Sequence, residues 1–331
     1  MEQKQKITRV VSLIRSTGQI HIGNWEGAIK NWVRLQDQYP CFFGVADWHA
    51  LTTKYEESKG LSEDSRVCFI DILSCGVDPE KATLFIQSAV PEHAELHLLL
   101  SMITPLGWLE RNPTYKEQLR ELSERNIQTY GFIGYPVLQA ADILIYHGDG
   151  VPIGQDQLPH LELTREIVRR FNHLYGELFK EPLPIFTEAP KVPGTDGRKM
   201  SKSYGNAIYL ADSKEEVEKK VRPMKTDIAR VTRKDPGNPD VCPVFDLHKI
   251  YTPPEPRAWC DTGCRTAGIG CLDCKLVLLE HLQPQLDVVR ERRKEFLKTP
   301  KKVDAIIAEG NRRAHEVASK TLGEVRKAIG V

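Results

Sequence analysis

A turn near the N-terminus carries residue types that bind phosphate groups. Residues 16–24 read Ser-Thr-Gly-Gln-Ile-His-Ile-Gly-Asn, and Gly18 and Gly23 let the backbone turn sharply and approach a ligand closely. His21 and Asn24 add side-chain donors that carry no fixed charge. Taken alone, the segment is equally compatible with an incidental turn between a strand and a helix.

A second segment, residues 197–203, reads Gly-Arg-Lys-Met-Ser-Lys-Ser. Its lysines, Lys199 and Lys202, stand three residues apart among serines and a glycine, a composition typical of a flexible cationic loop. Such a loop can close over a triphosphate and neutralise the charge that develops on a leaving pyrophosphate. A solvated charged loop is the ordinary alternative for any single run of lysine and serine.

The elements around the first segment predict how it is positioned. Three β-rich runs, at 9–14, 41–47 and 83–87, read as buried strands, with a crossover helix around 66–73. Their alternation predicts parallel βαβ units and an open α/β sheet. The first turn follows the first strand, where such sheets bind ligands, and the helix after it points free N–H groups towards any phosphate.

The C-terminal third has a different pattern. A helical rhythm is present at 213–221, at 271–296 and at 303–329, where Gly310 interrupts it, so we expect a mainly helical region. The segment 181–197 is rich in proline and glycine, which predicts a loop.

Bulk composition sets broad limits. Of the 331 residues, 40% are hydrophobic and 27% charged, and the formal net charge is +1, so no global field attracts nucleic acid. Every apolar run is shorter than the ~18 residues that a membrane-spanning helix needs, and the charged N-terminus lacks the apolar core of a signal peptide. We therefore expect a cytoplasmic protein without membrane association, whose cysteines are reduced.

The two phosphate-type segments together resemble the paired HIGN and KMSKS motifs of class I aminoacyl-tRNA synthetases. Three further stretches, at 111–118, 134–144 and 151–157, are similar to the tryptophanyl-tRNA synthetase family. The likeness runs from about Ser12 to Lys275.

This resemblance implies a fold, a reaction and partners. The implied fold is α/β, with a Rossmann-like parallel-sheet catalytic domain over 1–210 and a mainly helical, tRNA anticodon-binding domain over 211–331. The implied reaction is activation of L-tryptophan by Mg²⁺-bound ATP, followed by transfer to tRNA(Trp). The family members are homodimers, so a homodimer is expected here.

The chemistry of tryptophan adds a requirement to this expectation. An indole N–H can only donate a hydrogen bond, so a buried tryptophan needs an acceptor deep in its pocket. In the family this acceptor matches Asp142. The residues that the resemblance assigns to tryptophan are Asp142, Tyr135, Gln157, His49, Val151 and Ile153. Leu13, Arg15 and Gln139 differ from residues common in the family, which leaves the shape of the pocket open.

The resemblance also assigns the residues that bind ATP. Asp156 matches the acidic residue that holds the ribose hydroxyls, and His21, Lys199 and Lys202 match the catalytic positions. The sequence has no obvious Ser–His or Cys–His pair, which agrees with catalysis by positioning and charge stabilisation. The implied ATP-binding set is Arg15, Ser16, Thr17, Gly23, Asn24, Gly154, Gln155, Asp156, Val192, Lys199, Met200, Ser201, Lys202 and Ser203.

Five cysteines are crowded into residues 242–274, namely Cys242, Cys260, Cys264, Cys271 and Cys274. Thiolates at such spacing select an iron–sulfur cluster or zinc, and some members of the resembling family carry a [4Fe–4S] cluster with similar spacing. We expect a [4Fe–4S] cluster on Cys242, Cys264, Cys271 and Cys274, with zinc as the alternative metal and Cys260 as the alternative to Cys242. A group of reduced thiols without metal is the remaining alternative.

A basic stretch over 290–302 is a candidate tRNA-binding face, although a solvated helix surface is as plausible for any one of its charges. Two other functions remain open at this point. One is a tyrosine–tRNA ligase of the same architecture, and the other is a non-catalytic RNA-binding relative, which the two intact phosphate segments disfavour.

Overall fold

The computed structural model describes residues 6–16, 18–121, 127–186 and 192–331. The chain divides into two compact units. The first, called the sheet unit, comprises Met1–Gly18, Asn31–Glu188 and Thr299–Val331, and the second, called the motif unit, comprises Gln19–Lys30 and Ala189–Lys298.

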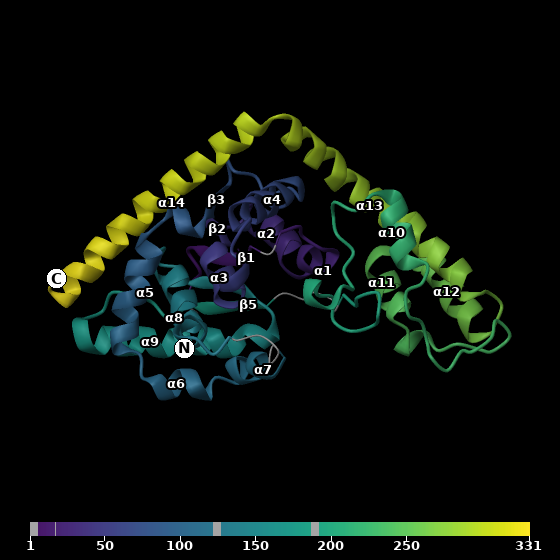
Figure 1. Ribbon diagram of the computed structural model, residues 1–331, viewed down its shortest axis with the longest axis horizontal. Helices are drawn as coiled ribbons and strands as arrows, with labels where there is room; N and C mark the ends of the chain where they lie inside the picture. The colour runs from purple at the N-terminus through teal and green to yellow at the C-terminus, as the bar shows by residue number, and fades with distance from the viewer. Residues whose placement is uncertain (1–5, 17, 122–126, 187–191) are drawn as a thin grey trace. The chain divides into compact units, whose positions relative to one another are not determined.

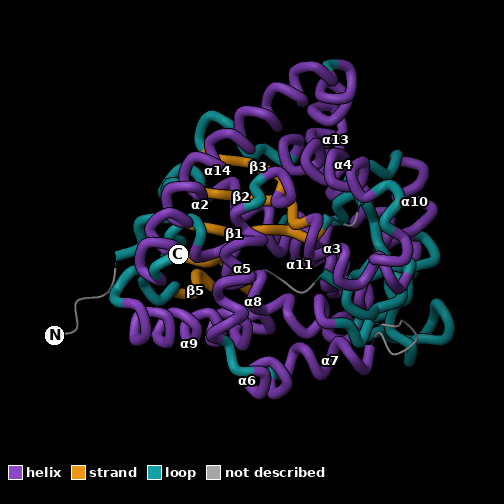
Figure 2. The backbone as a smooth tube through the Cα atoms, turned by 60° about the vertical axis from the view of Figure 1, so that its left-hand side comes forward, coloured by secondary structure: helices purple, strands orange, loops and turns teal. Residues whose placement is uncertain are grey.

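The sheet unit is built on five parallel strands in the order β3-β2-β1-β4-β5 (Figure 2). All six residues of the interior strand β2 are buried, as expected for a parallel strand covered on both faces. The α/β fold and three of its strands are therefore confirmed. The strands are β1 (Val10–Arg15), β2 (Cys41–Ala46), β3 (Ala82–Ile86), β4 (Gly150–Ile153) and β5 (Leu183–Phe186).

β4 and β5 were not predicted. Residues 181–197 were expected to form a loop, but Leu183–Phe186 pairs with Gly150–Ile153 as the edge strand of the sheet. Pro184 is tolerated there because an edge strand needs hydrogen bonds on one side only. The prediction of a loop was therefore wrong for residues 183–186, because proline and glycine content does not exclude an edge strand.

Helices surround the sheet. The buried helix α8 packs against α5 and α9, and their apolar side chains form a hydrophobic core cluster together with α14. The helices of this unit are α2 (Lys30–Leu35, of which Lys30 belongs to the motif unit), α3 (Asp47–Lys54), α4 (Leu61–Ser74), α5 (Glu92–Ile103), α6 (Leu106–Arg111), α7 (Pro113–Glu121), α8 (Tyr130–Leu144), α9 (Leu158–Tyr175) and α14 (Pro300–Ile329).

The C-terminal helix α14 covers the edge strand β3 (Figure 1). Gly310 was expected to interrupt this helix, but the helix continues through it. A Cβ at Gly310 would lie 1.8 Å from the carbonyl oxygen of Leu84, so glycine is what allows the helix to touch the strand. Asn311 Oδ1 then accepts the N–H of Ile86 at 2.9 Å, which satisfies a donor at the sheet edge.

The motif unit contains the remaining helices. The charged helix predicted at 213–221 is confirmed as α10, which Ser213 caps in a reciprocal arrangement with Glu216. The buried ammonium of Lys275 donates to the carbonyl oxygens of Arg222 and Met224, at 2.7 and 2.6 Å. The helices are α1 (Ile22–Asn24), which continues as a π-helical turn over Trp25–Ile29, α10 (Lys214–Val221), α11 (Pro243–Tyr251), α12 (Pro254–Arg265) and α13 (Cys271–Lys298).

The two units do not follow the predicted domain boundary at residue 210. Helix α14 packs with the sheet, and the segments 19–30 and 192–210 pack with the helical region. A pattern of apolar residues reveals a helix but not which surface the helix covers. No helix among the described residues is both long and apolar enough to cross a membrane.

Candidate active site

The predicted phosphate-binding turn leads directly into helix α1. His21 is its N-cap, with Nδ1 accepting the backbone N–H of Asn24 at 3.2 Å. Because Nδ1 is an acceptor, the proton of the neutral imidazole is on Nε2. Burial, followed by the positive charge of Lys202, lowers the pKa of His21 to about 4. His21 is therefore an uncharged donor through Nε2 at neutral pH.

The HIGN turn and the lysine segment are neighbours within the motif unit. His21 forms an antiparallel bridge with Tyr209, a few residues after the lysines. A Cβ on Gly23 would lie 2.9 Å from His21 Nδ1 and 3.5 Å from the Cβ of Met200, so a glycine is required at this contact. Two motifs that are about 180 residues apart in the sequence thus share one local structure.

One buried asparagine holds the backbone of the lysine segment. Asn206 Oδ1 accepts the N–H of Ser201 at 2.8 Å, while its Nδ2 donates to the carbonyl oxygen of Lys199 at 3.2 Å and to Asp196 Oδ1 at 2.7 Å. Lys199 is exposed and Lys202 half-buried. The loop therefore has a fixed backbone and presents its ammonium groups on accessible side chains.

The other predicted ATP residues differ in exposure. Met200 and Val192 are buried, and the N–H of Met200 donates to the carbonyl oxygen of Val192 at 3.3 Å. Ser16 is fully buried, with its Oγ 2.7 Å from that of Ser65. Thr17 lies outside the described residues. Arg15, Gln155, Asp156 and Ser203 are exposed, and Gly23, Asn24, Gly154 and Ser201 are half-buried.

Asp142 is the centre of a buried hydrogen-bond network in the sheet unit. Its Oδ1 accepts Gln87 Nε2 and His93 Nδ1, both at 2.7 Å, and its Oδ2 accepts His49 Nε2 at 2.8 Å. The far nitrogen of His93, Nε2, lies 2.7 Å from the hydroxyl oxygen of Tyr146. Two of the residues predicted to bind tryptophan, Asp142 and His49, are therefore in direct contact.

The network keeps Asp142 ionised. Burial alone would raise its pKa, but hydrogen bonds and charge from His49 and His93 outweigh burial and lower the pKa to about 2. A carboxylate offers about four lone-pair positions, and the three donors leave one of them, on Oδ2.

A second buried network orients Tyr135. Asn112 Oδ1 accepts the N–H of Thr114 at 3.0 Å, so its Nδ2 faces His160 Nδ1, 3.2 Å away, and donates to it. The remaining ring proton of His160 is then on Nε2, which donates to the Tyr135 hydroxyl oxygen at 3.0 Å. Burial, followed by His49, lowers the pKa of His160 to about 4. The Tyr135 hydroxyl therefore accepts from His160 and keeps its own proton for another acceptor.

The remaining predicted tryptophan residues lie on β4 and just after it. Val151 and Ile153 are buried in a small apolar cluster with Ile143 and Leu161. Gln157 is half-buried, and its Nε2 donates to Asp156 Oδ2 at 3.2 Å.

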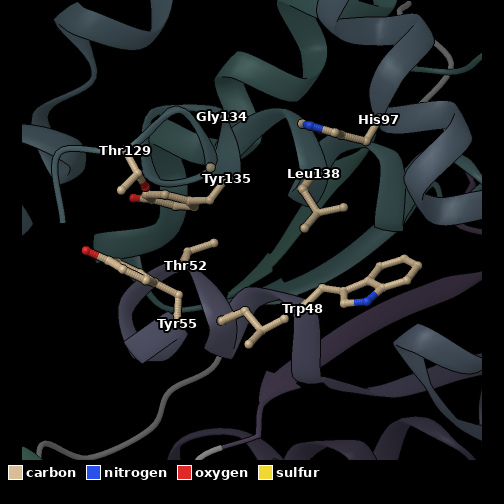
Figure 3. A pocket seen from close by; sticks show the side chains of 10 residues that line it. Trp48, Thr52, Tyr55, His97, Thr129, Gly134, Tyr135 and Leu138 are labelled. Carbon is tan, nitrogen blue, oxygen red and sulfur yellow. The ribbon is translucent and has the colours of Figure 1, made fainter. Parts of the chain in front are cut away.

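A cavity of about 320 Å³ opens between helices α3, α5 and α8 (Figure 3). Trp48, Leu51 and Thr52 from α3 line it, together with His97 of α5 and Tyr135 of α8. The walls are mainly apolar and aromatic, as in sites for small organic ligands. Asp142 is not among its lining residues, although its neighbour Tyr135 is.

Five residues of these networks were not predicted from the sequence, namely Gln87, His93, Asn112, Tyr146 and His160. Gln87 had a usable signal, because it directly follows β3, at the strand end where α/β sheets bind ligands. Asn112 lies in the recognised stretch 111–118 but had no assigned role. His93, Tyr146 and His160 are buried on helices or beyond them, where sequence offers no signal that separates them from ordinary core residues.

The clustered cysteines converge in a combination that differs from the predicted quartet. Ligand atoms of His248, Cys260 and Cys274 lie within 4.8 Å of one another. His248 Nε2 is 3.1 Å from the carbonyl oxygen of Cys274 and 3.3 Å from its Sγ. Because a carbonyl only accepts, Nε2 carries the proton. Only Cys274 of the predicted quartet belongs to this trio within the part of the chain that the structure describes.

The other predicted thiols lie close enough to interact with this group. The pKa of Cys264 is raised by burial and also by Cys242 and Cys271. The pKa of Cys274 is raised first by its hydrogen bond with Cys260 and further by burial, Cys242 and Cys264. All five thiols therefore gather in one region, and the predicted ligand set stays a prediction.

Residues 3–286 match the family model of class I tRNA synthetases, W and Y. The chain belongs to this family. Tryptophan–tRNA ligase of Thermotoga maritima is 52% identical, with 98% of this chain and 99% of that protein aligned. The ligase of Aquifex aeolicus is 46% identical, with 98% and 100% aligned.

Solved structures of synthetases have the same fold. Tryptophanyl-tRNA synthetase of Campylobacter jejuni, complexed with ADP and tryptophan, superimposes with a TM-score of 0.87 at 32% identity, covering 98% of this chain and 100% of that chain. Tyrosyl-tRNA synthetase of Archaeoglobus fulgidus, complexed with L-tyrosine, gives 0.67 at 22% identity, covering 88% and 91%, a likeness of fold alone. The class I synthetase fold expected from the two motifs is therefore confirmed.

Proposed function

We propose that this synthetase activates L-tryptophan with ATP and transfers the tryptophanyl group to tRNA(Trp). The curated relatives at 46–52% identity over nearly the whole chain are named tryptophan–tRNA ligases. Both phosphate motifs of the class are present and adjacent in the motif unit.

The observation that carries the choice of amino acid is the state of Asp142. It is 2% exposed, ionised and left with one open acceptor position. Indole N–H, which only donates, satisfies such a position fully. A phenol can both donate and accept, so a tyrosine pocket does not need to be built around a lone carboxylate. The network of Asp142 therefore favours tryptophan over tyrosine.

The first chemical step is attack by the tryptophan carboxylate on the α-phosphate of ATP. One P–O bond forms, the bond to the β-phosphate breaks, and pyrophosphate leaves with the electron pair. His21 Nε2–H supplies an uncharged donor, and Lys199 and Lys202 supply positive charge for the phosphates as negative charge shifts onto pyrophosphate. Mg²⁺ enters with ATP. In the second step a hydroxyl of the terminal ribose of tRNA attacks the tryptophanyl carbonyl carbon and loses its proton, an ester bond forms, and the bond to the phosphate breaks so that AMP leaves.

Tyr135 contributes a directed hydroxyl. Because His160 Nε2 donates to its oxygen, the Tyr135 proton is available to an acceptor on the substrate. We assign Gln157, Val151 and Ile153 to the same substrate, and Arg15, Gly154, Gln155 and Asp156 to ATP, on the family likeness of their positions.

Amino-acid-dependent exchange of pyrophosphate into ATP tests the assignment. L-tryptophan should support exchange, and L-tyrosine should not at equal concentration. Charging of total tRNA with radioactive tryptophan tests the second step. Exchange that tyrosine drives as well as tryptophan would reject the amino-acid assignment, and the absence of any exchange would reject the enzyme.

We assign tRNA anticodon binding to the helical part of the motif unit and a cytoplasmic location to the protein. Arg290 is not part of the candidate tRNA-binding face, because it is 9% exposed and donates to the carbonyl oxygen of Asp212 at 2.7 Å and to Gln283. The exposed residues of that stretch, Lys294 among them, remain candidates.

The cysteine region fits a metal centre through its donor chemistry. Five thiols gather there, and thiolates select iron–sulfur clusters or zinc. We propose a [4Fe–4S] cluster held by Cys242, Cys264, Cys271 and Cys274, whose contribution is structural, with zinc as the alternative. His248 Nε2 carries a proton directed at Cys274, so it is not a free ligand nitrogen.

Metal analysis of protein purified without oxygen separates the alternatives. A cluster gives about four irons per chain and a brown colour. One zinc in colourless protein would replace the iron–sulfur assignment, and neither metal would reject both. Cys242→Ser and Cys260→Ser form a matched pair of variants. Cys242→Ser should lose the metal, because Cys242 is a proposed ligand, and Cys260→Ser should keep it.

We also propose a homodimer through helices α5, α6 and α8 of the sheet unit. Leu98, Met102, Leu106 and Tyr130 are between 51 and 73% exposed on these helices, which pack together. A second copy of the chain would cover these apolar side chains. Met102→Glu should convert the dimer to a monomer in light scattering, whereas Lys294→Glu, on the motif unit, should not.

A further inference from the structure

His93 occupies a special place among the residues of the Asp142 network. It is fully buried, it stacks on Phe85 with ring centroids 5.7 Å apart, and both its nitrogens are hydrogen-bonded. Its partners are Asp142 on one side and Tyr146 on the other. Tyr146 is itself fixed by stacking on Phe42, with centroids 4.6 Å apart.

The hydrogen bond between His93 and Asp142 has a defined direction. The carboxylate of Asp142 only accepts, so His93 Nδ1 must carry a proton. His93 Nε2 and the Tyr146 hydroxyl oxygen share a hydrogen bond across 2.7 Å. The chain therefore links Tyr146 to His93, and His93 Nδ1–H donates to Asp142 Oδ1.

This direction decides which carboxylate oxygen is open. Oδ1 accepts both His93 and Gln87, so its two lone pairs are occupied. Oδ2 accepts His49 alone among the described residues and retains one lone pair. Without the His93 proton, Oδ1 would have a vacant lone pair as well, and the carboxylate would no longer present a single defined acceptor.

We propose that His93, oriented by Tyr146, is a positioning residue that selects tryptophan by presenting only Oδ2 of Asp142 to the indole N–H. This inference rests on the proposed role of Asp142. His93 does not touch the substrate in this scheme. It acts by fixing the rotation and the open lone pair of the residue that does.

Two substitutions separate positioning from simple packing. In asparagine the amide nitrogen is bonded to Cγ, as Nδ1 is in histidine, so His93→Asn keeps a donor for Asp142. In glutamine the amide lies one bond further out, near the place of Nε2, so His93→Gln loses that donor and faces Tyr146 instead. Both variants lose the His93 ring that stacks on Phe85. If His93 only filled space, Asn would be no better a replacement than Gln.

The experiment compares L-tryptophan with β-(3-benzothienyl)-L-alanine, in which sulfur replaces the indole N–H at nearly the same shape. The ratio of their kcat/KM values in pyrophosphate exchange measures recognition of the N–H. We expect His93→Asn to keep most of the parent ratio and His93→Gln to lose roughly tenfold, the change expected when a hydrogen bond to a charged group is lost. The KM for ATP should stay at the parent value in both.

The variant Asp142→Asn separates the positioning role of His93 from the acceptor role of Asp142 on which it rests. If this variant keeps the parent ratio, the indole acceptor is elsewhere and the role of His93 fails with it. If Asp142→Asn loses the ratio while His93→Gln keeps it, only the positioning role is overturned. Equal losses in His93→Asn and His93→Gln would also overturn it, in favour of packing.

Tyr146→Phe is the second test of the positioning role. It replaces His93→Gln if the melting temperature shows that His93→Gln is not folded. It preserves the ring on Phe42 and removes only the hydroxyl. We expect a loss of discrimination in the same direction as in His93→Gln but smaller, because His93 keeps its bond to Asp142. An unchanged ratio in Tyr146→Phe overturns the proposed orientation by Tyr146.

Discussion

The Asp142 network and the lysine segment both carry functional charge, but the first holds it buried and the second holds it at the surface. Asp142 is buried, and its charge is met by three donors from three other parts of the sheet unit. Lys199 and Lys202 lie in the motif unit on accessible side chains, above a backbone that Asn206 fixes. A permanent charge inside the protein selects a ground-state ligand, whereas accessible charge on a loop can respond to charge that appears during the reaction.

The strongest test of this difference is Lys202→Ala. Removing one stabiliser of the developing pyrophosphate charge should lower the rate of adenylate formation by ~10²–10³-fold, because the interaction is made in the transition state. Single-turnover kinetics gives this rate, and ATP titration gives the affinity, which should change far less. If the variant is impaired only in ATP affinity, Lys202 acts in ground-state binding of ATP. Its role would then not differ from that of Asp142 in the way described above.

The next test concerns the buried histidine that is hydrogen-bonded to Tyr135. The pKa of His160 is lowered by burial to about 4 from an ordinary 6.5, so the unfolded chain binds more protons than the folded one between these values. Its contribution to stability is complete above about pH 6.5 and is lost as the pH falls towards 4, by roughly 3 kcal/mol. His160→Gln should therefore flatten the decline of the melting temperature between pH 7 and 4.5.

A comparison variant makes that measurement specific. His173→Gln changes a histidine on the surface of the same helix, α9, and should leave the pH dependence as in the parent. If both variants flatten the decline equally, burial is not the cause of the proton uptake.

Asp142→Ala tests the specificity side. Removal of the buried acceptor should reduce discrimination between tryptophan and phenylalanine by ~1–3 kcal/mol, through the lost hydrogen bond to the indole N–H. Affinity for ATP should be nearly unchanged. Pyrophosphate exchange with each amino acid measures the discrimination, and a variant as selective as its parent contradicts the assignment.

The smallest effect is expected from an exposed charge of the lysine segment. Arg198 pairs with Asp196 at 2.6 Å, but its side chain is 61% exposed, so Arg198→Ala should lower the free energy of unfolding by less than ~1 kcal/mol. Urea denaturation measures this value. A loss of several kcal/mol would mean that the loop, like the Asp142 network, depends on its charges for its structure.

Local sequence predicted those parts of the protein whose chemistry lies in consecutive residues. The strands around 9–14 and 41–47 were readable because continuous apolar runs mark buried parallel strands. The HIGN turn and the lysine segment were readable because glycine, histidine and lysine at fixed spacing have a direct chemical meaning. Asp142 was found through family likeness and the donor-only character of indole.

Only the tertiary structure decided which residues act together. His49, Gln87 and His93 are brought to Asp142 from three separate segments, and no spacing in the sequence connects them to it. Gly310 looks like a helix breaker until its contact with Leu84 shows why a side chain would not fit. Periodicity states that a residue is buried, but the partner of a buried polar group depends on how distant elements pack, which is a property of the whole fold.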